Sequence, residues 1–130
     1  MPFVHIRLQG KKLDEKELDQ MQLDATNLMV DVMGKKGELT AVLIEQVAGA
    51  RWAVGGTTAP IAAHLEVAVT EGTNSPEQKA KFVKEAADLL RRAGGNLPLA
   101  TYVVVREVSG NAWGYDGLTQ EDRKQLMAAA

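Results

Sequence analysis

Residues 40–58 read TAVLIEQVAGARWAVGGTT, and a closely similar stretch, TYVVVREVSGNAWGYDGLT, follows 61 positions later at residues 101–119. Each stretch opens with a threonine and an apolar run, and each closes with a tryptophan followed by glycine. The chain has only two tryptophans, and this single shift superposes Trp52 on Trp113. Matches that keep their order along the whole stretch predict an internal duplication.

The duplication extends toward the amino terminus of both stretches. The first copy begins with the alternating segment VHIRLQ at residues 4–9, and the second with HLEVAVTE at residues 64–71. Apolar residues at every second position indicate a strand with one buried face. We therefore interpret the chain (1–130) as a single domain made of two pseudo-symmetric units, residues 2–59 and residues 60–130.

Between the two strands of each unit, apolar residues recur at intervals of three and four, which is typical of a helix with one buried face. They are Leu18, Met21, Ala25, Leu28, Met29 and Val32 in the first unit, and Phe82, Ala86, Leu89, Leu90 and Ala93 in the second. Ser75, Pro76 and Gln78 predict the start of the second helix, because they fit a cap, a first turn and a capping box. Gly94 and Gly95 predict its end.

Each unit thus follows a strand–helix–strand order, and the right-handed crossover rule makes its two strands parallel. We predict an α+β fold in which the two β-α-β units join edge to edge, giving a four-stranded sheet with two helices on one face. The second strands are nearly continuous apolar runs, so the other face of the sheet also needs cover. We expect a closed homo-oligomer to provide it. The final segment, residues 118–130, predicts a short helix capped near Thr119, to which we assign no chemical role.

Composition argues against several functions. The net charge of −2 makes a nucleic-acid partner unexpected, and the lack of cysteine excludes thiolate catalysis and cysteine zinc sites. His5 and His64 are too far apart in sequence to indicate a metal pair. The apolar runs are too short to span a bilayer, and the first ten residues alternate instead of forming a signal-peptide block. We expect a cytoplasmic protein with no metal site and no membrane partner.

Several features together resemble the tautomerase superfamily. They are Pro2 directly after Met1, the alternating strand, Gly10 at the first turn, the helix, the apolar strand and the tail GARWAVGG at residues 49–56. The closest pattern is a fused 4-oxalocrotonate tautomerase, with two short subunits in one chain, and the resemblance covers residues 2–119. It implies a trimer, since short members form hexamers. It also implies small enol or 2-oxo carboxylate substrates, no cofactor and an amino-terminal proline as general base and acid.

The chemistry of Pro2 depends on whether Met1 is removed. A free α-amine titrates near pH ~8, and burial or neighbouring cations disfavour its charged form, which suits a base working at neutral pH. With Met1 retained, the same nitrogen belongs to an amide and has no basicity. Pro2 could also serve only to start an edge strand, where proline is tolerated; the duplicated architecture favours the catalytic role. Ala63 occupies the equivalent position in the second unit, so we expect one site per chain.

The sequence departs from the family pattern at the substrate-binding arginines. Lys11 follows Gly10, and Thr73 follows Gly72, where the family has an arginine. The second-strand arginine of the family is replaced by Ala41 in the first unit and Tyr102 in the second.

Other residues could take over from these arginines. Arg106 is the first candidate, because a guanidinium can hold a carboxylate with two parallel hydrogen bonds. The alternative is an ion pair between Arg106 and Glu45, its counterpart in the first unit. The resemblance implies that Trp113 provides an apolar wall beside Pro2, with Tyr102 and Thr73 as further substrate-binding residues. For Trp52 we favour simple packing of the tail against the sheet.

The sequence therefore predicts an isomerase, a keto–enol tautomerase in which Pro2 moves a proton on a small carboxylate. Two alternatives remain open within the enzyme class, namely a hydratase or dehalogenase of haloacrylates and a decarboxylase of 3-oxo acids. The missing arginines motivate a third alternative, a non-catalytic oligomeric scaffold that binds ligands.

Overall fold

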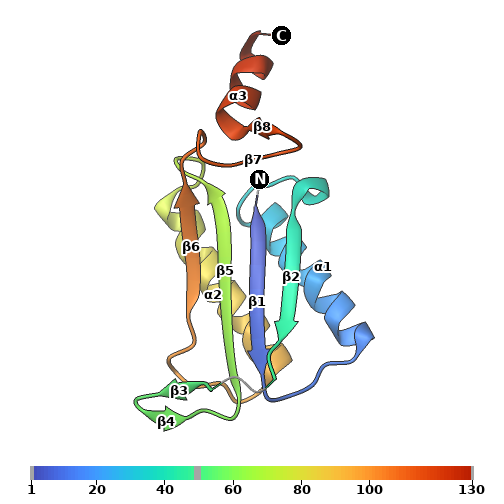
Figure 1. Cartoon of the computed structure of the whole chain (residues 1–130), viewed down its shortest axis with the longest axis vertical. Helices are drawn as coiled ribbons and strands as arrows, with labels where there is room; N and C mark the ends of the chain where they lie inside the picture. Colours follow the sequence, from blue (N-terminus) through green and yellow to red (C-terminus); the bar gives the residue numbers. More distant parts are fainter. Residues whose placement is uncertain (1, 49–50, 130) are drawn as a thin grey trace.

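The computed structural model describes residues 2–48 and 51–129 (Figure 1). The first unit consists of β1 (Phe3–Gln9), α1 (Glu15–Asp31), a 3₁₀ turn, η1 (Gly37–Leu39), and β2 (Ala41–Gln46). The second unit consists of β5 (Ala62–Thr70), α2 (Pro76–Gly94) and β6 (Val103–Val108). The predicted strand–helix–strand order is therefore confirmed in both units.

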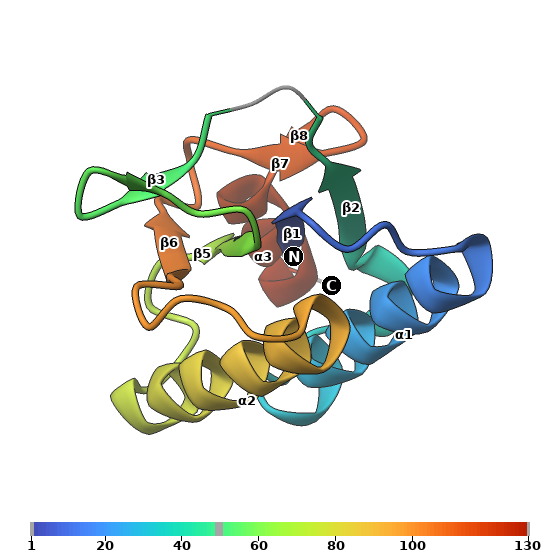
Figure 2. The same ribbon diagram turned by 90° about the horizontal axis from the view of Figure 1, so that it is seen from below.

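The four long strands form one sheet in the order β2-β1-β5-β6. Each unit contributes a parallel pair, and the units meet where β1 and β5 run antiparallel, with Phe3 opposite Ala68 and Gln9 opposite Ala62. Both crossover helices lie on the same face of this sheet (Figure 2). The predicted α+β architecture is confirmed, with the pseudo-two-fold relation between the units falling between the two central strands.

Each tail folds into a small hairpin. The first pairs β3 (Ala53–Val54) with β4 (Thr57–Thr58), and the second pairs β7 (Gly114–Tyr115) with β8 (Leu118–Thr119). The two hairpins are closed by equivalent hydrogen bonds. The amide of Ala59 donates to the carbonyl of Trp52 at 2.9 Å, and the amide of Gln120, 61 positions later, donates to the carbonyl of Trp113 at 3.0 Å. Gly49 and Ala50 of the first tail lie outside the described residues.

The two hairpin turns have the same backbone geometry despite different residues. Gly55 and Gly56 have φ values of 60° and 79°, and Asp116 and Gly117 have values of 50° and 84°. Positive φ at both central residues is the signature of a type I′ turn, in which Asp-Gly is a favoured pair. Asp116 therefore replaces the first glycine without changing the turn.

Side chains at the helix starts support both crossovers. The Asp14 carboxylate accepts a hydrogen bond of 2.8 Å from the amide of Glu17, and the Glu17 carboxylate accepts one of 3.2 Å from the amide of Asp14. Ser75 and Gln78 make the same reciprocal pair at 3.1 and 2.9 Å, as predicted. Such boxes satisfy amide groups that have no partner within the helix. The second helix ends at Gly94, also as predicted.

The hydrophobic core lies between the sheet and the two helices. Its largest fully buried side chains are Phe82, Ile6, Met29, Met33, Leu65, Leu90, Val4, Val67 and Val69. The opposite face of the sheet, which we call the open face, is uncovered in the single chain. Two large apolar side chains on it, Phe3 and Leu43, are each 43% exposed. The open face therefore keeps the apolar surface for which the sequence predicts cover by further copies.

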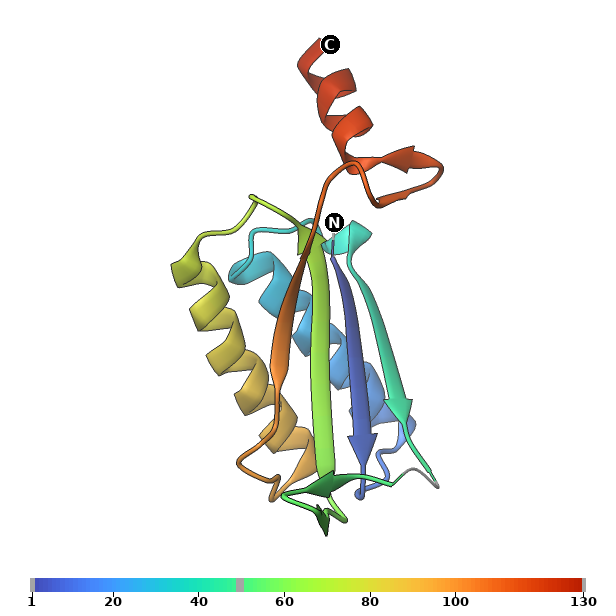
Figure 3. The ribbon, with the colours of Figure 1, turned by 60° about the vertical axis from the view of Figure 1, so that its left-hand side comes forward.

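The chain ends in α3 (Gln120–Ala129), which extends beyond the sheet above the start of β1 (Figures 1 and 3). The Thr119 hydroxyl accepts a hydrogen bond of 3.0 Å from the amide of Asp122, which confirms the predicted cap. No helix within residues 2–48 and 51–129 has both the length and the apolar character that a bilayer crossing needs.

Candidate active site

Pro2 lies at the end of the sheet where β1 and β2 both begin. It is buried, and its carbonyl oxygen accepts a hydrogen bond of 3.2 Å from the amide of Ala41. We call this the Pro2 end; it also comprises residues 32–40, which precede β2, and residues 71–75, which follow β5. The removal of Met1, on which a free amine depends, lies outside the described residues.

Two of the predicted substrate-binding residues lie at the Pro2 end. The indole nitrogen Nε1 of Trp113 donates a hydrogen bond of 3.1 Å to the hydroxyl of Thr70, the last residue of β5. The Thr73 hydroxyl donates one of 2.6 Å to the carbonyl oxygen of Thr70. Because β5 ends beside the start of β1, these contacts bring Trp113 and Thr73 to the same end of the sheet as Pro2.

Lys35 is a cation at this end that the sequence analysis did not single out. Its Nζ atom donates a hydrogen bond of 2.7 Å to the Thr73 hydroxyl, so that it joins the first unit to the second. Burial lowers the pKa of Lys35 from its ordinary value, because an apolar surrounding disfavours the charged amine. A partly desolvated ammonium is a stronger partner for an anion than one in bulk water.

The strand–helix–strand topology alone predicts that Lys35 lies near the amino terminus. In a parallel β-α-β unit the loop after the helix leads to the start of the second strand, which lies beside the start of the first. A lysine in that loop, as in Gly34-Lys35-Lys36, therefore returns to the amino end of the chain. The arginine positions of the family lie in other segments and give no indication of this loop.

Arg106 occupies the open face in the same row as Phe3, since Ala68 pairs with both residues. Its Nη2 atom lies 3.1 Å from a carboxylate oxygen of Glu66. The pairing expected as the alternative, with Glu45, is not formed, because β2 and β6 are the two opposite edges of the sheet. Glu45 instead contacts His5 and lies 3.6 Å from Nε of Arg7.

These contacts set the electrostatics of the open face. Hydrogen bonds from His64 and then from Arg106 lower the pKa of Glu66. A hydrogen bond from His5 is the largest cause lowering the pKa of Glu45. The two carboxylates are therefore held in their charged form by neighbours on the same face.

The remaining predicted residue, Tyr102, lies at the opposite end of the sheet. It immediately precedes β6, and its carbonyl oxygen accepts a hydrogen bond of 3.2 Å from the amide of Leu65, near the start of β5. The same end holds Trp52 and Ala63, the counterpart of Pro2, whose nitrogen is part of the chain. Lys11 also lies there, 3.3 Å from Glu17. Tyr102 is 66% exposed, so its ring is free to contact another copy of the chain.

A pocket of about 380 Å³ lies at the Pro2 end, between the loop that carries Lys35 and the carboxyl-terminal helix α3. Its size falls in the range of small-molecule sites. A larger pocket, of about 670 Å³, lies at the opposite end and is lined by Trp52, Arg51 and His64 among others. Pro2 lines neither of these two pockets, and Lys35 is the residue that links the first of them to the contacts at the Pro2 end.

Comparison with known proteins relates this chain to tautomerases by sequence. The model of the family described as Tautomerase enzyme matches residues 2–59 and again residues 64–123. The probable tautomerase K2 of Dickeya dadantii (strain 3937) is 36% identical over 56 residues, which cover 43% of this chain and 84% of that protein.

Solved structures of similar fold cover nearly the whole chain. The asymmetric trimer of wild-type F6 fused 4-OT has a TM-score of 0.80 at 16% identity, covering 93% of this chain and 98% of that one. Pt0534 inactivated by 2-oxo-3-pentynoate has a TM-score of 0.82 at 15% identity, with the same two coverages of 93% and 98%. At such identities the likeness shows a shared fold.

Proposed function

The chain belongs to the family of tautomerase enzymes, and on this premise we propose that Pro2 interconverts the enol and keto forms of a small 2-oxo carboxylate. The observation that carries the proposal is the position of Pro2: a buried proline at the end of the sheet where Lys35, Thr73 and Trp113 also lie. The substrate class rests on this cation and on the chemistry of a free secondary amine.

The proposed reaction needs one group that both takes and returns a proton. The neutral amine of Pro2 removes the proton from the enol hydroxyl, and the electron pair of that O–H bond forms the carbonyl. The ammonium that results then delivers a proton to the substrate carbon, where the former C–C double bond supplies the new C–H bond. The amine is thereby restored, and no other reactant is consumed.

Binding the carboxylate is assigned to Lys35 in the first place. Lys35 lies at the Pro2 end and is partly buried, and its hydrogen bond to Thr73 fixes its direction. Arg106 is the second candidate, although its guanidinium is already paired with Glu66. Trp113 is assigned the apolar wall, which excludes water and so strengthens the contact between cation and carboxylate.

We further propose that the chain works as a trimer. The support is the exposed apolar part of the open face, together with the trimeric fused 4-OT of similar fold. Within one chain, Tyr102 and Pro2 lie at opposite ends of the sheet. Tyr102 can therefore contribute to a Pro2 site only from a neighbouring copy. Light scattering of the purified protein gives the number of copies directly.

The decisive experiment follows the ketonisation of a simple dienol acid, 2-hydroxypenta-2,4-dienoate, by its loss of absorbance. The intact mass of the protein first establishes whether Met1 is removed. The protein should accelerate ketonisation, and Pro2→Ala should reduce kcat by about a hundredfold or more, the size expected for loss of a positioned base. Unchanged activity in Pro2→Ala, or a retained Met1 in active protein, would contradict the proposal.

The alternative reactions of the enzyme class are tested with the same protein. Incubation with 3-chloroacrylate, with release of chloride as the readout, tests hydration and dehalogenation. Evolution of carbon dioxide from a 3-oxo acid tests decarboxylation. Pt0534, by its description, is inactivated by 2-oxo-3-pentynoate, so a mass increase confined to the amino-terminal peptide after exposure to this acid would support a reactive amine at Pro2.

A further inference from the structure

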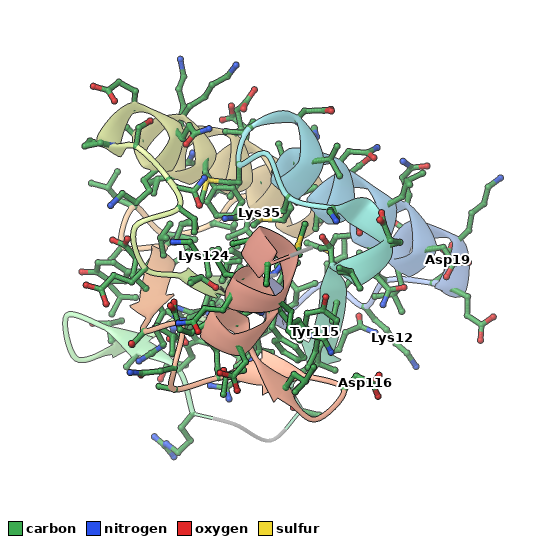
Figure 4. All side chains as sticks on the ribbon, turned by 90° about the horizontal axis from the view of Figure 1, so that it is seen from above. Lys12, Asp19, Lys35, Tyr115, Asp116 and Lys124 are labelled. Carbon is green, nitrogen blue, oxygen red and sulfur yellow. The ribbon has the colours of Figure 1, made fainter. Side chains whose placement is uncertain are left out.

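The pocket at the Pro2 end is built from two segments far apart in the sequence. Its floor comes from the loop after α1, with Gly34, Lys35, Lys36 and Leu39, and its roof from the end of the chain, with Tyr115, Gln120, Arg123, Lys124 and Met127. Lys35 and Lys124 both line this pocket, and the view from above shows both labels on the same side of α3 (Figure 4). The helix that the sequence leaves without a chemical role therefore forms one wall of this pocket.

The charged residues that line the pocket are all cations. Four of its nine lining residues are cations, and none of the nine is acidic. Like charges gathered around a partly desolvated lysine repel one another, and an anion in the pocket would relieve that repulsion. The chemistry of the lining therefore matches a carboxylate.

Arg123 has a different task from the other cations. Its guanidinium lies over the ring of Tyr115, 3.8 Å from the ring centre, and it donates a hydrogen bond of 2.8 Å to the carbonyl oxygen of the same residue. These two contacts tie α3 to the hairpin that follows Trp113. Its Nε atom is buried and has no hydrogen-bond acceptor among the described residues. Lys124, by contrast, is exposed and makes no ion pair within residues 2–48 and 51–129, so its ammonium is free to bind a ligand.

Comparison of the two units shows that only the hairpin at the Pro2 end is followed by a helix. The hairpin β3–β4 at the opposite end leads directly into β5, whereas the hairpin β7–β8 leads into α3. The helix is thus an addition to the repeat, and it lies at the end that holds Pro2. The end equipped with Ala63 in place of Pro2 has no such helix.

From these observations we propose that α3 completes the substrate site, with Lys124 opposite Lys35 as a second binding cation for the substrate carboxylate. Arg123 acts as a positioning residue, because it holds α3 over the pocket through Tyr115. This inference rests on the proposed function for the identity of the ligand as a substrate. A lysine of α3 would then take the place of the family's substrate-binding arginines, which are absent from their usual positions in this sequence.

The test separates binding from chemistry. In the active protein, Lys124→Gln should raise KM for 2-hydroxypenta-2,4-dienoate about tenfold with kcat nearly unchanged, which is the loss expected for one charge-assisted hydrogen bond. Lys124→Arg should restore most of the affinity. Lys84→Gln, which removes an exposed lysine from α2, is the matched control and should leave KM unchanged.

A second measurement does not depend on activity. Crotonate, an unreactive monocarboxylate, is titrated calorimetrically into Pro2→Ala and into Pro2→Ala combined with Lys124→Gln. The second protein should bind crotonate about tenfold more weakly, and the difference should shrink at high salt. If the unsubstituted protein has no tautomerase activity while crotonate binding still depends on Lys124, the proposed function fails and this inference stands. Equal binding by both proteins, or no binding by either, would overturn the inference while leaving Pro2 chemistry untouched.

Discussion

Lys35 Nζ and Thr73 Oγ1 are 2.7 Å apart, and this hydrogen bond joins the two units at the end of the sheet where Pro2 lies. The contact fixes a partly buried cation by a residue of the other unit. Residues of both units therefore build the Pro2 end.

Replacing Lys35 should weaken substrate binding more than replacing its partner. Lys35→Ala should raise KM for 2-hydroxypenta-2,4-dienoate about tenfold, because the charge-assisted contact to the carboxylate is lost. Thr73→Val keeps the charge and should raise KM only about twofold. Steady-state kinetics of both variants, with exposed Lys16→Ala as control, checks this; an effect of Thr73→Val equal to that of Lys35→Ala would argue for a structural role.

The pH dependence of KM should follow the titration of Lys35. Burial lowers its pKa from the ordinary value of 10.5, so the ammonium loses its proton at a lower pH than an exposed lysine would. Carboxylate binding needs the charged form, and KM should therefore rise as the pH increases through this lowered pKa. A Lys35→Arg variant should keep KM constant over the same interval, since a guanidinium stays protonated. A KM that rises equally in the variant would assign the titration to another group.

The two tryptophans provide a matched pair of variants. Trp113→Ala should lower kcat/KM about tenfold or more, because it opens the apolar wall at the Pro2 end. Trp52→Ala removes the equivalent ring at the opposite end and should change kcat/KM less than about twofold. The comparison controls for the general cost of losing a tail tryptophan. Equal losses in the two variants would mean that both rings act through stability alone, which thermal unfolding of the variants would reveal.

Stability should depend on the core between the helices and the sheet. Phe82 is 1% exposed, and Phe82→Ala should cost about 3–5 kcal/mol of unfolding free energy through lost burial and the cavity left behind. The neighbouring Val83 is 40% exposed, and Val83→Ala should cost less than about 1 kcal/mol. Urea unfolding at one fixed protein concentration measures both values. Similar costs for the two variants would contradict the described packing of α2.

Acidification should remove stability that the open-face carboxylates supply. Hydrogen bonds from His64 and Arg106 lower the pKa of Glu66 below its ordinary value of 4.5. A depressed pKa in the folded state contributes stability above the unfolded value, and this stability is lost as the pH falls through the folded one. Tm should therefore decline below about pH 4.5, and less steeply in Glu66→Gln. An identical decline in both proteins would place the acid-sensitive groups elsewhere.

The fold could be predicted because its signals are local and are written twice. Alternation, helical spacing and the Ser75-Pro76 start predicted the four long strands and the two crossover helices. The repeated order predicted that two similar units join edge to edge. The short hairpins were not predicted, because Gly55-Gly56 and Asp116-Gly117 signal a turn without showing what pairs across it. The start of α3 at Thr119 was predicted, but its place above β1 depends on Arg123 and Tyr115, whose contact only the folded chain displays.

The candidate site was predicted in part. Pro2, Trp113 and Thr73 do lie at one end of the sheet, whereas Tyr102 lies at the other. The alternative considered for Arg106, an ion pair with Glu45, was wrong for a geometric reason: residues related by a two-fold axis between β1 and β5 lie at equal distances on opposite sides of it. Counterparts on the outer strands, such as Glu45 and Arg106, are therefore the residues least able to touch.

The antiparallel pairing of β1 with β5 also bears on how this chain can evolve. In an assembly of identical short subunits, a substitution changes every copy of the subunit, so the two ends of a sheet built from two copies cannot differ. Covalent linkage of the halves removes that constraint, and the pole that holds Pro2 can then change independently of the other. The pole around Ala63 and Trp52 is then constrained only by what its residues, such as Tyr102, do for a neighbouring copy in the proposed trimer, and its other positions are open to drift or to a new ligand.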